Sequence, residues 1–225
     1  MINHVNEIYR MKKIKGVIFD LDGVICNTSR YHFLAWEELA DELKIPFTET
    51  DNERLKGVSR SVSLDILLSL GDISAAPEQK AAWMEEKNVC YLKYVEQMTE
   101  EELLPGVGEF IGRLRKNGVK IALGSASKNA RTILEHLGIR RCFDYIVDGT
   151  MVRHPKPDPE VFLQAAEGMG LLPEECLVFE DAQAGLSAAA AGNIRCVYVG
   201  GSEKIEGADY RITGFLDQGL EEIVL

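Results

Sequence analysis

Two carboxylates, Asp20 and Asp22, directly follow a run of three apolar residues, Val17–Phe19. Burying bare carboxylates beside such a run is costly unless they have partners of opposite charge. A second acidic pair, Glu180 and Asp181, follows the apolar residues CLVF in the same way. Four carboxylates gathered at one place would repel one another unless a cation lay among them. Because every ligand atom would be oxygen, the pattern favours a magnesium ion.

Positive and neutral polar groups also follow apolar runs, and their chemistry suits a phosphoryl group. Lys156 lies in the segment HPKPD and carries a compact positive charge. The segment SASKN, residues 125–129, offers a hydroxyl and backbone N–H groups where we expect a helix to begin at about Lys128. Helix N-termini with serine or asparagine nearby bind anions well.

A phosphoryl group bound in this way is open to attack by a carboxylate. If Mg²⁺ and Lys156 neutralise the phosphate, Asp20 can form an aspartyl phosphate while Asp22 moves the proton. Taken alone, the two aspartates could also form an ordinary turn after a strand, since Asp-Gly is common turn chemistry. The other acidic pair, Lys156 and SASKN together favour the catalytic interpretation.

These groups meet only if the fold brings four distant segments together. From about Leu104 onward, apolar runs such as VKIALGSA and CLVFED alternate with helical patterns such as KNARTILEHLG and AQAGLSAAAAG. This alternation predicts a parallel sheet covered by helices on both faces, and the run IKGVIFD adds its first strand. Ligands of such sheets bind beyond the carboxyl ends of the strands, where all four segments would lie.

The block from Asn27 to Met98 has no convincing strand and is typical of helices. Helical patterns cover RYHFLAWEELADELK, SRSVSLDILLSLG and a long segment that begins at Pro77. We therefore expect two domains. An α/β core would comprise residues 1–27 and 99–225, and a small helical domain, residues 28–98, would be inserted after the first strand.

The composition narrows the class of protein. The 225 residues are 46% hydrophobic and 27% charged, as is ordinary for a globular chain, and no segment approaches the roughly 18 apolar residues of a membrane span. A net charge of −11 and a pI near 4.9 argue against nucleic acid as a partner. Five scattered cysteines indicate reduced thiols, and with no signal-peptide pattern in the first dozen residues we expect a cytoplasmic protein.

Four motifs in order, DLDGVICNT, SASKN, KPDP and EDAQAG, resemble those of the haloacid dehalogenase (HAD) superfamily of aspartate-nucleophile phosphotransferases. The resemblance covers nearly the whole chain. It implies an α/β fold in which a Rossmann-like parallel-sheet HAD core carries an inserted α-helical cap domain.

Within the superfamily, YHFLAW, LKGVSR and SASKN together are most similar to the β-phosphoglucomutase family. Members of that family interconvert β-D-glucose 1-phosphate and D-glucose 6-phosphate. The resemblance implies an aspartyl-phosphate enzyme, β-glucose 1,6-bisphosphate as intermediate and activator, one Mg²⁺ per chain, a cap that closes over the site, and a monomer.

Carried over residue by residue, the resemblance implies catalytic and metal-binding roles. Asp20 would be the nucleophile and Asp22 the general acid/base. Magnesium would be held by Asp20, the backbone carbonyl of Asp22 and Asp181. Glu180 would be a further ligand or act through water.

The resemblance also implies binding roles on both sides of the site. The reacting phosphoryl group would lie against Ser125, the amide of Ala126 and Lys156. Further positions would hold the distal phosphate, at the other end of the sugar, or would position the sugar and couple cap closure to Asp22. The distal-phosphate residues would be Arg60, Ser127, Lys128 and Asn129, and the cap residues would be His32, Trp36, Lys56, Gly57, Val58, Ser63 and Lys87.

Other interpretations stay open at this point. A sugar-phosphate or phosphoglycolate-like phosphatase would share the same core. A non-catalytic sugar-phosphate sensor would need the binding groups but not the acid/base pair. Lys87 could simply pair with Glu85 or a neighbour on its helix, and Asp181 could cap the helix that follows it. The chain departs from the family pattern at Cys26-Asn27 and at Gly124.

Overall fold

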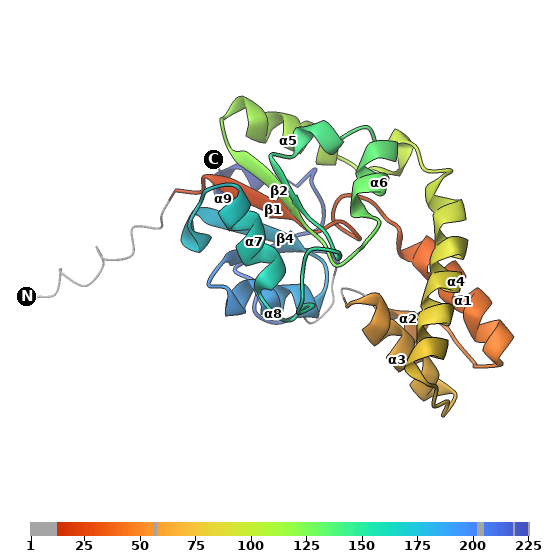
Figure 1. The fold of residues 1–225 in the computed structure, drawn as a ribbon. Coiled ribbons are helices and arrows are strands. Elements are labelled where there is room, and N and C mark those ends of the chain that lie inside the picture. Colours follow the sequence, from red (N-terminus) through yellow and green to blue (C-terminus); the bar gives the residue numbers. More distant parts are fainter. Residues whose placement is uncertain (1–12, 56–57, 202–204, 218, 225) are drawn as a thin grey trace, which may run out of the picture.

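The computed structural model describes residues 13–55, 58–201, 205–217 and 219–224 (Figure 1). Its centre is a sheet in the order β3-β2-β1-β4-β5-β6, and every neighbouring pair is parallel. The first strand therefore lies between β2 and β4, where the strand order reverses. The strands are β1 (Gly16–Phe19), β2 (Lys120–Gly124), β3 (Tyr145–Val147), β4 (Cys176–Glu180), β5 (Arg195–Val199) and β6 (Tyr210–Ile212).

Both faces of the sheet are covered, which explains why its central strands are continuously apolar. Side chains alternate along β1, so Val17 and Phe19 pack into one hydrophobic cluster and Ile18 packs into another. Helices α5 (Val107–Lys116), α6 (Ala130–His136) and α9 (Leu220–Val224) belong to the first cluster, and α7 (Glu160–Gly168) and α8 (Gln183–Ala191) belong to the second. In Figure 1, α5 and α6 lie on one side of the sheet and α7 and α8 lie on the other.

Of the α-helices between β1 and β2, the first four lie to one side of the sheet, and we call them the cap (Figure 1). They have a hydrophobic cluster of their own, which includes Trp36, Leu39, Leu64 and Leu67. The cap helices are α1 (Ser29–Leu43), α2 (Glu49–Glu53), α3 (Arg60–Leu70) and α4 (Pro77–Val95).

The chain enters and leaves the cap through two segments that lie side by side. The backbone N–H of Leu104 donates to the carbonyl of Ile25 over 2.9 Å, and Cys26 and Leu103 form an antiparallel bridge. Close to this junction, the hydroxyl of Tyr31 in α1 donates to Oε1 of Glu102 over 2.7 Å. The last bond ties the base of the cap to the short 3₁₀ turn η1 (Glu100–Glu102).

The fold class predicted from the sequence is confirmed: an α/β core with a parallel sheet carries an insertion of helices. Helix α6 begins at Ala130, two residues later than expected, after Asn129 as its N-cap. The sequence analysis did not identify α2, β6 or α9. All five cysteines are free, as predicted, and no helix in the described part of the chain is long and apolar enough to cross a membrane.

Candidate active site

The carboxyl ends of β1, β2 and β4 form one edge of the sheet and bring the candidate residues together. In register, Phe19 lies beside Leu123 on one side and beside Phe179 on the other. Asp20, which follows β1, donates its backbone N–H to the carbonyl of Phe179 over 2.9 Å. The segment SASKN follows β2, and Glu180 ends β4. Parallel strand order therefore places acidic and phosphate-binding segments at the same edge.

Lys156, from the connection between β3 and α7, lies between two of these carboxylates. Its Nζ is 2.6 Å from Oδ1 of Asp20 and 2.7 Å from Oε1 of Glu180. All three residues are buried. One ammonium group thus joins residues that are far apart in sequence.

The acidic residues still exceed the positive charge at this edge, and their geometry fits a metal ion. Asp20, Glu180 and Asp181 each offer a carboxylate oxygen, and these atoms lie within 4.8 Å of one another. Two glycines leave room for them. A Cβ at Gly23, whose φ is +76°, would lie 2.0 Å from Oδ2 of Asp181, and one at Gly185 would lie 1.7 Å from Oε1 of Glu180. An all-oxygen set with excess negative charge suits Mg²⁺.

Burial changes the acidity of the central groups. It raises the pKa of Asp20 to about 7, although the ammonium of Lys156 opposes this shift. Burial also raises the pKa of Asp22 to about 6. For Lys156 burial acts in the opposite direction, but the carboxylates of Asp20 and Glu180 outweigh it and hold the lysine pKa above its usual value. Asp22 is therefore poised to take up and release a proton near neutral pH.

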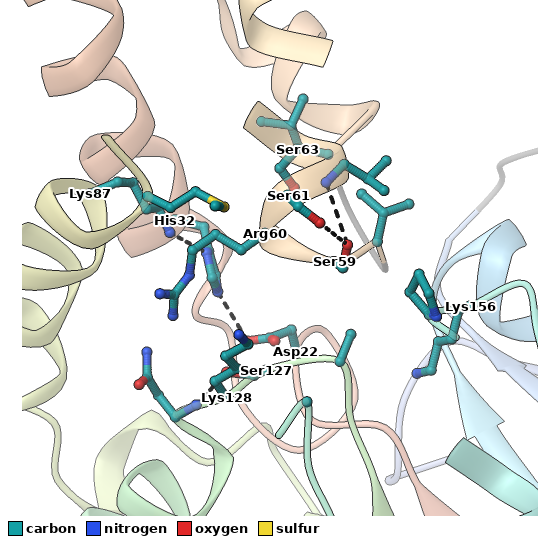
Figure 2. A pocket seen from close by; sticks show the side chains of 18 of the residues that line it. Asp22, His32, Ser59, Arg60, Ser61, Ser63, Lys87, Ser127, Lys128 and Lys156 are labelled. Atoms are coloured by element: carbon teal, nitrogen blue, oxygen red, sulfur yellow. Dashed lines mark hydrogen bonds and ion pairs between the residues drawn. The ribbon is translucent and has the colours of Figure 1, made fainter. Parts of the chain in front are cut away.

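Asp22 faces a histidine from the cap, as Figure 2 shows. Nε2 of His32 lies 3.9 Å from Oδ1 of Asp22, an oxygen that is buried and accepts no hydrogen bond from the described residues. On the other side of the ring, Nζ of Lys87 lies 2.9 Å from Nδ1 of His32. The ammonium group also lies over the rings of Trp36 and Tyr91, 4.8 Å and 4.6 Å from their centroids.

The surroundings of Lys87 differ from those of a surface lysine. The residue is buried, and burial lowers its pKa to about 7. Burial likewise lowers the pKa of His32 well below its usual value. The alternative that Lys87 pairs with Glu85 is not what the described residues show: Lys87 packs against Trp36 of α1 and lies within hydrogen-bond distance of His32.

The phosphate-binding candidates lie on two sides of one cavity (Figure 2). Arg60 is the first residue of α3 in the cap, whereas Ser127, Lys128 and Asn129 follow β2 in the core. The core turn is held by its own hydroxyls, because Ser125 Oγ accepts from the N–H of Ser127 and Ser127 Oγ accepts from the N–H of Asn129.

The cavity has a volume of about 520 Å³ and is bounded by both the core and the cap. Most of the candidates from the sequence line it. Ser125 and Glu180 are fully buried beside it, and Lys56 and Gly57 lie outside the described residues. The lining candidates are Asp20, Asp22, His32, Trp36, Val58, Arg60, Ser63, Lys87, Ala126, Ser127, Lys128, Asn129, Lys156 and Asp181.

One residue of the site has a different place from the one predicted, and two others were not predicted. The N-cap position of α8 is Ala182, one residue later than the expected Asp181. Tyr91, which stacks on His32 with ring centroids 4.3 Å apart, was not predicted as a site residue, although it follows Lys87 by one helical turn. Asn88, which hydrogen-bonds to Arg60, was not predicted either, and an asparagine inside a helix carries no sequence signal for such a role.

The chain is similar to known proteins over most of its length. Residues 14–193 match the model of haloacid dehalogenase-like hydrolases. The chain is 42% identical over 210 residues to β-phosphoglucomutase of Bacillus subtilis, covering 92% of this chain and 93% of that protein. It is 32% identical to the phosphorylated carbohydrates phosphatase of Thermotoga maritima, covering 82% and 84%. A crystal structure of β-phosphoglucomutase from Clostridium difficile superposes with a TM-score of 0.89 at 40% identity, covering 93% of this chain and 95% of that one.

Proposed function

Because the chain belongs to the haloacid dehalogenase-like hydrolase family, we propose that it uses the family's aspartate chemistry to interconvert β-D-glucose 1-phosphate and D-glucose 6-phosphate. The reaction would pass through an aspartyl-phosphate enzyme and β-glucose 1,6-bisphosphate. The similarity to two β-phosphoglucomutases across more than nine tenths of the chain supports this substrate. Residues 28–98 would form the cap, and residues 1–27 and 99–225 would form the core.

The observation that carries the proposal is a single cavity with cationic groups at two places. Lys156 and the SASKN turn belong to the core, whereas Arg60 belongs to the cap. A bisphosphate has two phosphates to bind at once, and it must present either end to Asp20. Arg60 suits the distal phosphate because a guanidinium can bind phosphate oxygens in pairs.

In this mechanism Asp20 attacks phosphorus and carries the phosphoryl group, while the sugar oxygen leaves with a proton from Asp22. In the second half, Asp22 takes the proton from the other sugar hydroxyl as that oxygen attacks the aspartyl phosphate. Lys156, Ser125 and the amide of Ala126 hold the phosphoryl oxygens. Bound Mg²⁺, held by Asp20, the Asp22 carbonyl, Asp181 and Glu180, would supply neutralisation of phosphate charge.

His32 and Lys87 orient the acid/base residue. When charged, Lys87 donates a hydrogen bond to Nδ1 of His32, so the proton of the neutral ring lies on Nε2. Nε2 faces Asp22. His32 comes from the cap and Asp22 from the core, so proton transfer depends on the approach of the two parts. A closed cap also keeps water from the aspartyl phosphate, as a mutase requires. We propose that one chain is sufficient, because residues of a single chain supply both sides of the cavity.

The alternative is a sugar-phosphate phosphatase, favoured by the 32% identity to a phosphorylated carbohydrates phosphatase. To separate the two activities, the protein is incubated with β-glucose 1-phosphate and a trace of β-glucose 1,6-bisphosphate. Glucose 6-phosphate and free phosphate are followed separately. The mutase predicts glucose 6-phosphate as the main product. Predominant release of phosphate would instead establish the phosphatase.

A further inference from the structure

We propose that Asn88 is a positioning residue that locks Arg60 of the cap to Asn129 of the core, and so assembles the distal phosphate site. This inference rests on the proposed function, since it assigns the distal phosphate to Arg60 and Asn129. Asn88 itself would not touch the substrate.

The assignment starts from one oxygen atom that accepts two hydrogen bonds. Oδ1 of Asn88 accepts from Nη2 of Arg60 over 2.8 Å and from Nδ2 of Asn129 over 2.9 Å. The three residues belong to α4, to the start of α3 and to the N-cap of α6. Asn88 thus joins two cap helices to the core turn that carries SASKN.

The position of Asn88 relative to the cavity indicates that it positions other residues and does not bind the substrate itself. Arg60 and Asn129 line the cavity, whereas Asn88 is not among the described residues that do so. A guanidinium has five N–H donors, and the bond to Asn88 uses one of them. The remaining donors of Arg60 stay available to a phosphate, and the bond fixes the plane in which they lie.

The chemical type of the acceptor also matters. The amide carbonyl of Asn88 is neutral, so it orients Arg60 without cancelling its positive charge. A carboxylate at the same place would accept the same bonds but would form an ion pair with Arg60 and weaken its attraction for phosphate. The nearly isosteric change from asparagine to aspartate therefore tests charge separately from geometry.

The bond between Asn88 and Asn129 crosses from the cap to the core. It forms only when α4 lies against the turn after β2. Arg60 of the cap and Asn129 of the core donate to the same oxygen of Asn88. The distal site is therefore complete only when the cap lies against the core, as it does in this structure.

The test measures the binding of D-glucose 6-phosphate by calorimetry, together with KM and kcat for β-glucose 1-phosphate. Asn88→Ala should raise Kd and KM about three- to tenfold, as expected for a lost positioning hydrogen bond, with a smaller change in kcat. Asn88→Asp should weaken binding more than Asn88→Ala does. Gln97→Ala is the control, because Gln97 bonds to the Lys93 carbonyl just beyond the end of the same helix.

A double variant identifies the route of the effect. If Asn88 acts through Arg60, then Asn88→Ala in an Arg60→Ala background should weaken binding less than it does in the wild type. Unchanged Kd in both Asn88 variants would overturn the inference, as would equal losses with and without Arg60, or a wild type that does not bind glucose 6-phosphate. Release of phosphate alone by the wild type would refute the mutase, while the calorimetry would still decide the role of Asn88.

Discussion

Nζ of Lys87 in α4 lies 2.9 Å from Nδ1 of His32 in α1. The charged ammonium of Lys87 can only donate a hydrogen bond, so in that state it sets the tautomer of His32. The proton of the ring then lies on Nε2, which faces Asp22. Lys87 is buried, and His32, Trp36 and Tyr91 surround its ammonium group in place of water. Keeping a charge in such a place costs free energy of folding.

This cost predicts a pH-dependent stability. Burial and Arg60 lower the pKa of Lys87 to about 7, although Asp22 and Cys90 oppose the shift, whereas an unfolded lysine titrates near 10.4. Between these values the unfolded state binds more protons, so the lysine's contribution to stability improves as pH rises. Lys87→Met should therefore stabilise the fold more at pH 6 than at pH 9, the difference changing by at most about 1.4 kcal/mol per pH unit above 7.

Urea unfolding of wild type and variant at both pH values measures the effect. Lys80→Met is the control, because Lys80 lies on the same helix, is partly exposed and pairs with Asp65 at 2.7 Å. Its effect on stability should not grow at low pH. A constant difference between Lys87→Met and wild type across this range would contradict the lowered pKa of Lys87.

Asp20→Asn should abolish the phosphoenzyme, because the amide cannot attack phosphorus. We expect turnover to fall by on the order of 10⁴-fold or more, as when other enzymes lose a nucleophile. The measurement is the amount of labelled phosphate that stays on the protein after incubation with labelled β-glucose 1,6-bisphosphate and quenching in acid. Asp65→Asn, at an exposed position of α3, should label normally. Label that persists on the Asp20 variant would assign the nucleophile elsewhere.

Arg60→Ala should impair the mutase far more than the hydrolysis of acetyl phosphate, which has no distal phosphate. Loss of a charge-assisted contact to phosphate predicts a fall in kcat/KM of about tenfold to a hundredfold. Arg54→Ala, at an exposed arginine of the cap, serves as the control. Equal losses with both substrates would show that Arg60 supports the cap rather than the distal phosphate.

Gly185→Ala should lower both stability and activity, because the new Cβ would meet the carboxylate that bonds to Lys156. We expect a loss of about 1–3 kcal/mol, as for other overpacked positions. Gly112→Ala is the matched change in α5, where a Cβ has no neighbour within 4 Å. That variant should gain about 1 kcal/mol from helix propensity. Thermal unfolding of the pair distinguishes a specific clash from a general response to alanine.

Removal of divalent ions should lower the melting temperature as well as stop turnover. Asp20, Glu180 and Asp181 would then repel one another without a neutralising ion, and added Mg²⁺ should raise Tm by mass action. The Tm readout is independent of substrate. In Asp181→Ala the rise of Tm with Mg²⁺ should be much reduced, and an unchanged rise would place the ion away from this cluster.

The sequence predicted the parts of the fold that depend on long or strongly patterned segments. The apolar run at β1 and the strand–helix alternation after residue 104 sufficed for the parallel sheet, and the sheet sufficed to bring Asp20, Lys156 and Glu180 together. Helix α2 has five residues and β6 has three, which is too short for a hydrophobic period to emerge.

Side-chain environments were less predictable, because they depend on several elements at once. Lys87 follows two glutamates and has the local pattern of a solvated residue, yet packing of α4 against α1 buries it. The role of Asn88 depends on the meeting of α3, α4 and the turn before α6, which no local pattern encodes.

The cap joins the core through two adjacent chain segments, at Ile25–Cys26 and Leu103–Leu104. Since the insertion starts and finishes at one spot, the four helices form a cassette whose replacement need not shift any strand. Exchanging or reshaping this cassette would therefore alter one wall of the cavity, and with it the molecules that fit there, while Asp20 and the sheet stay unchanged.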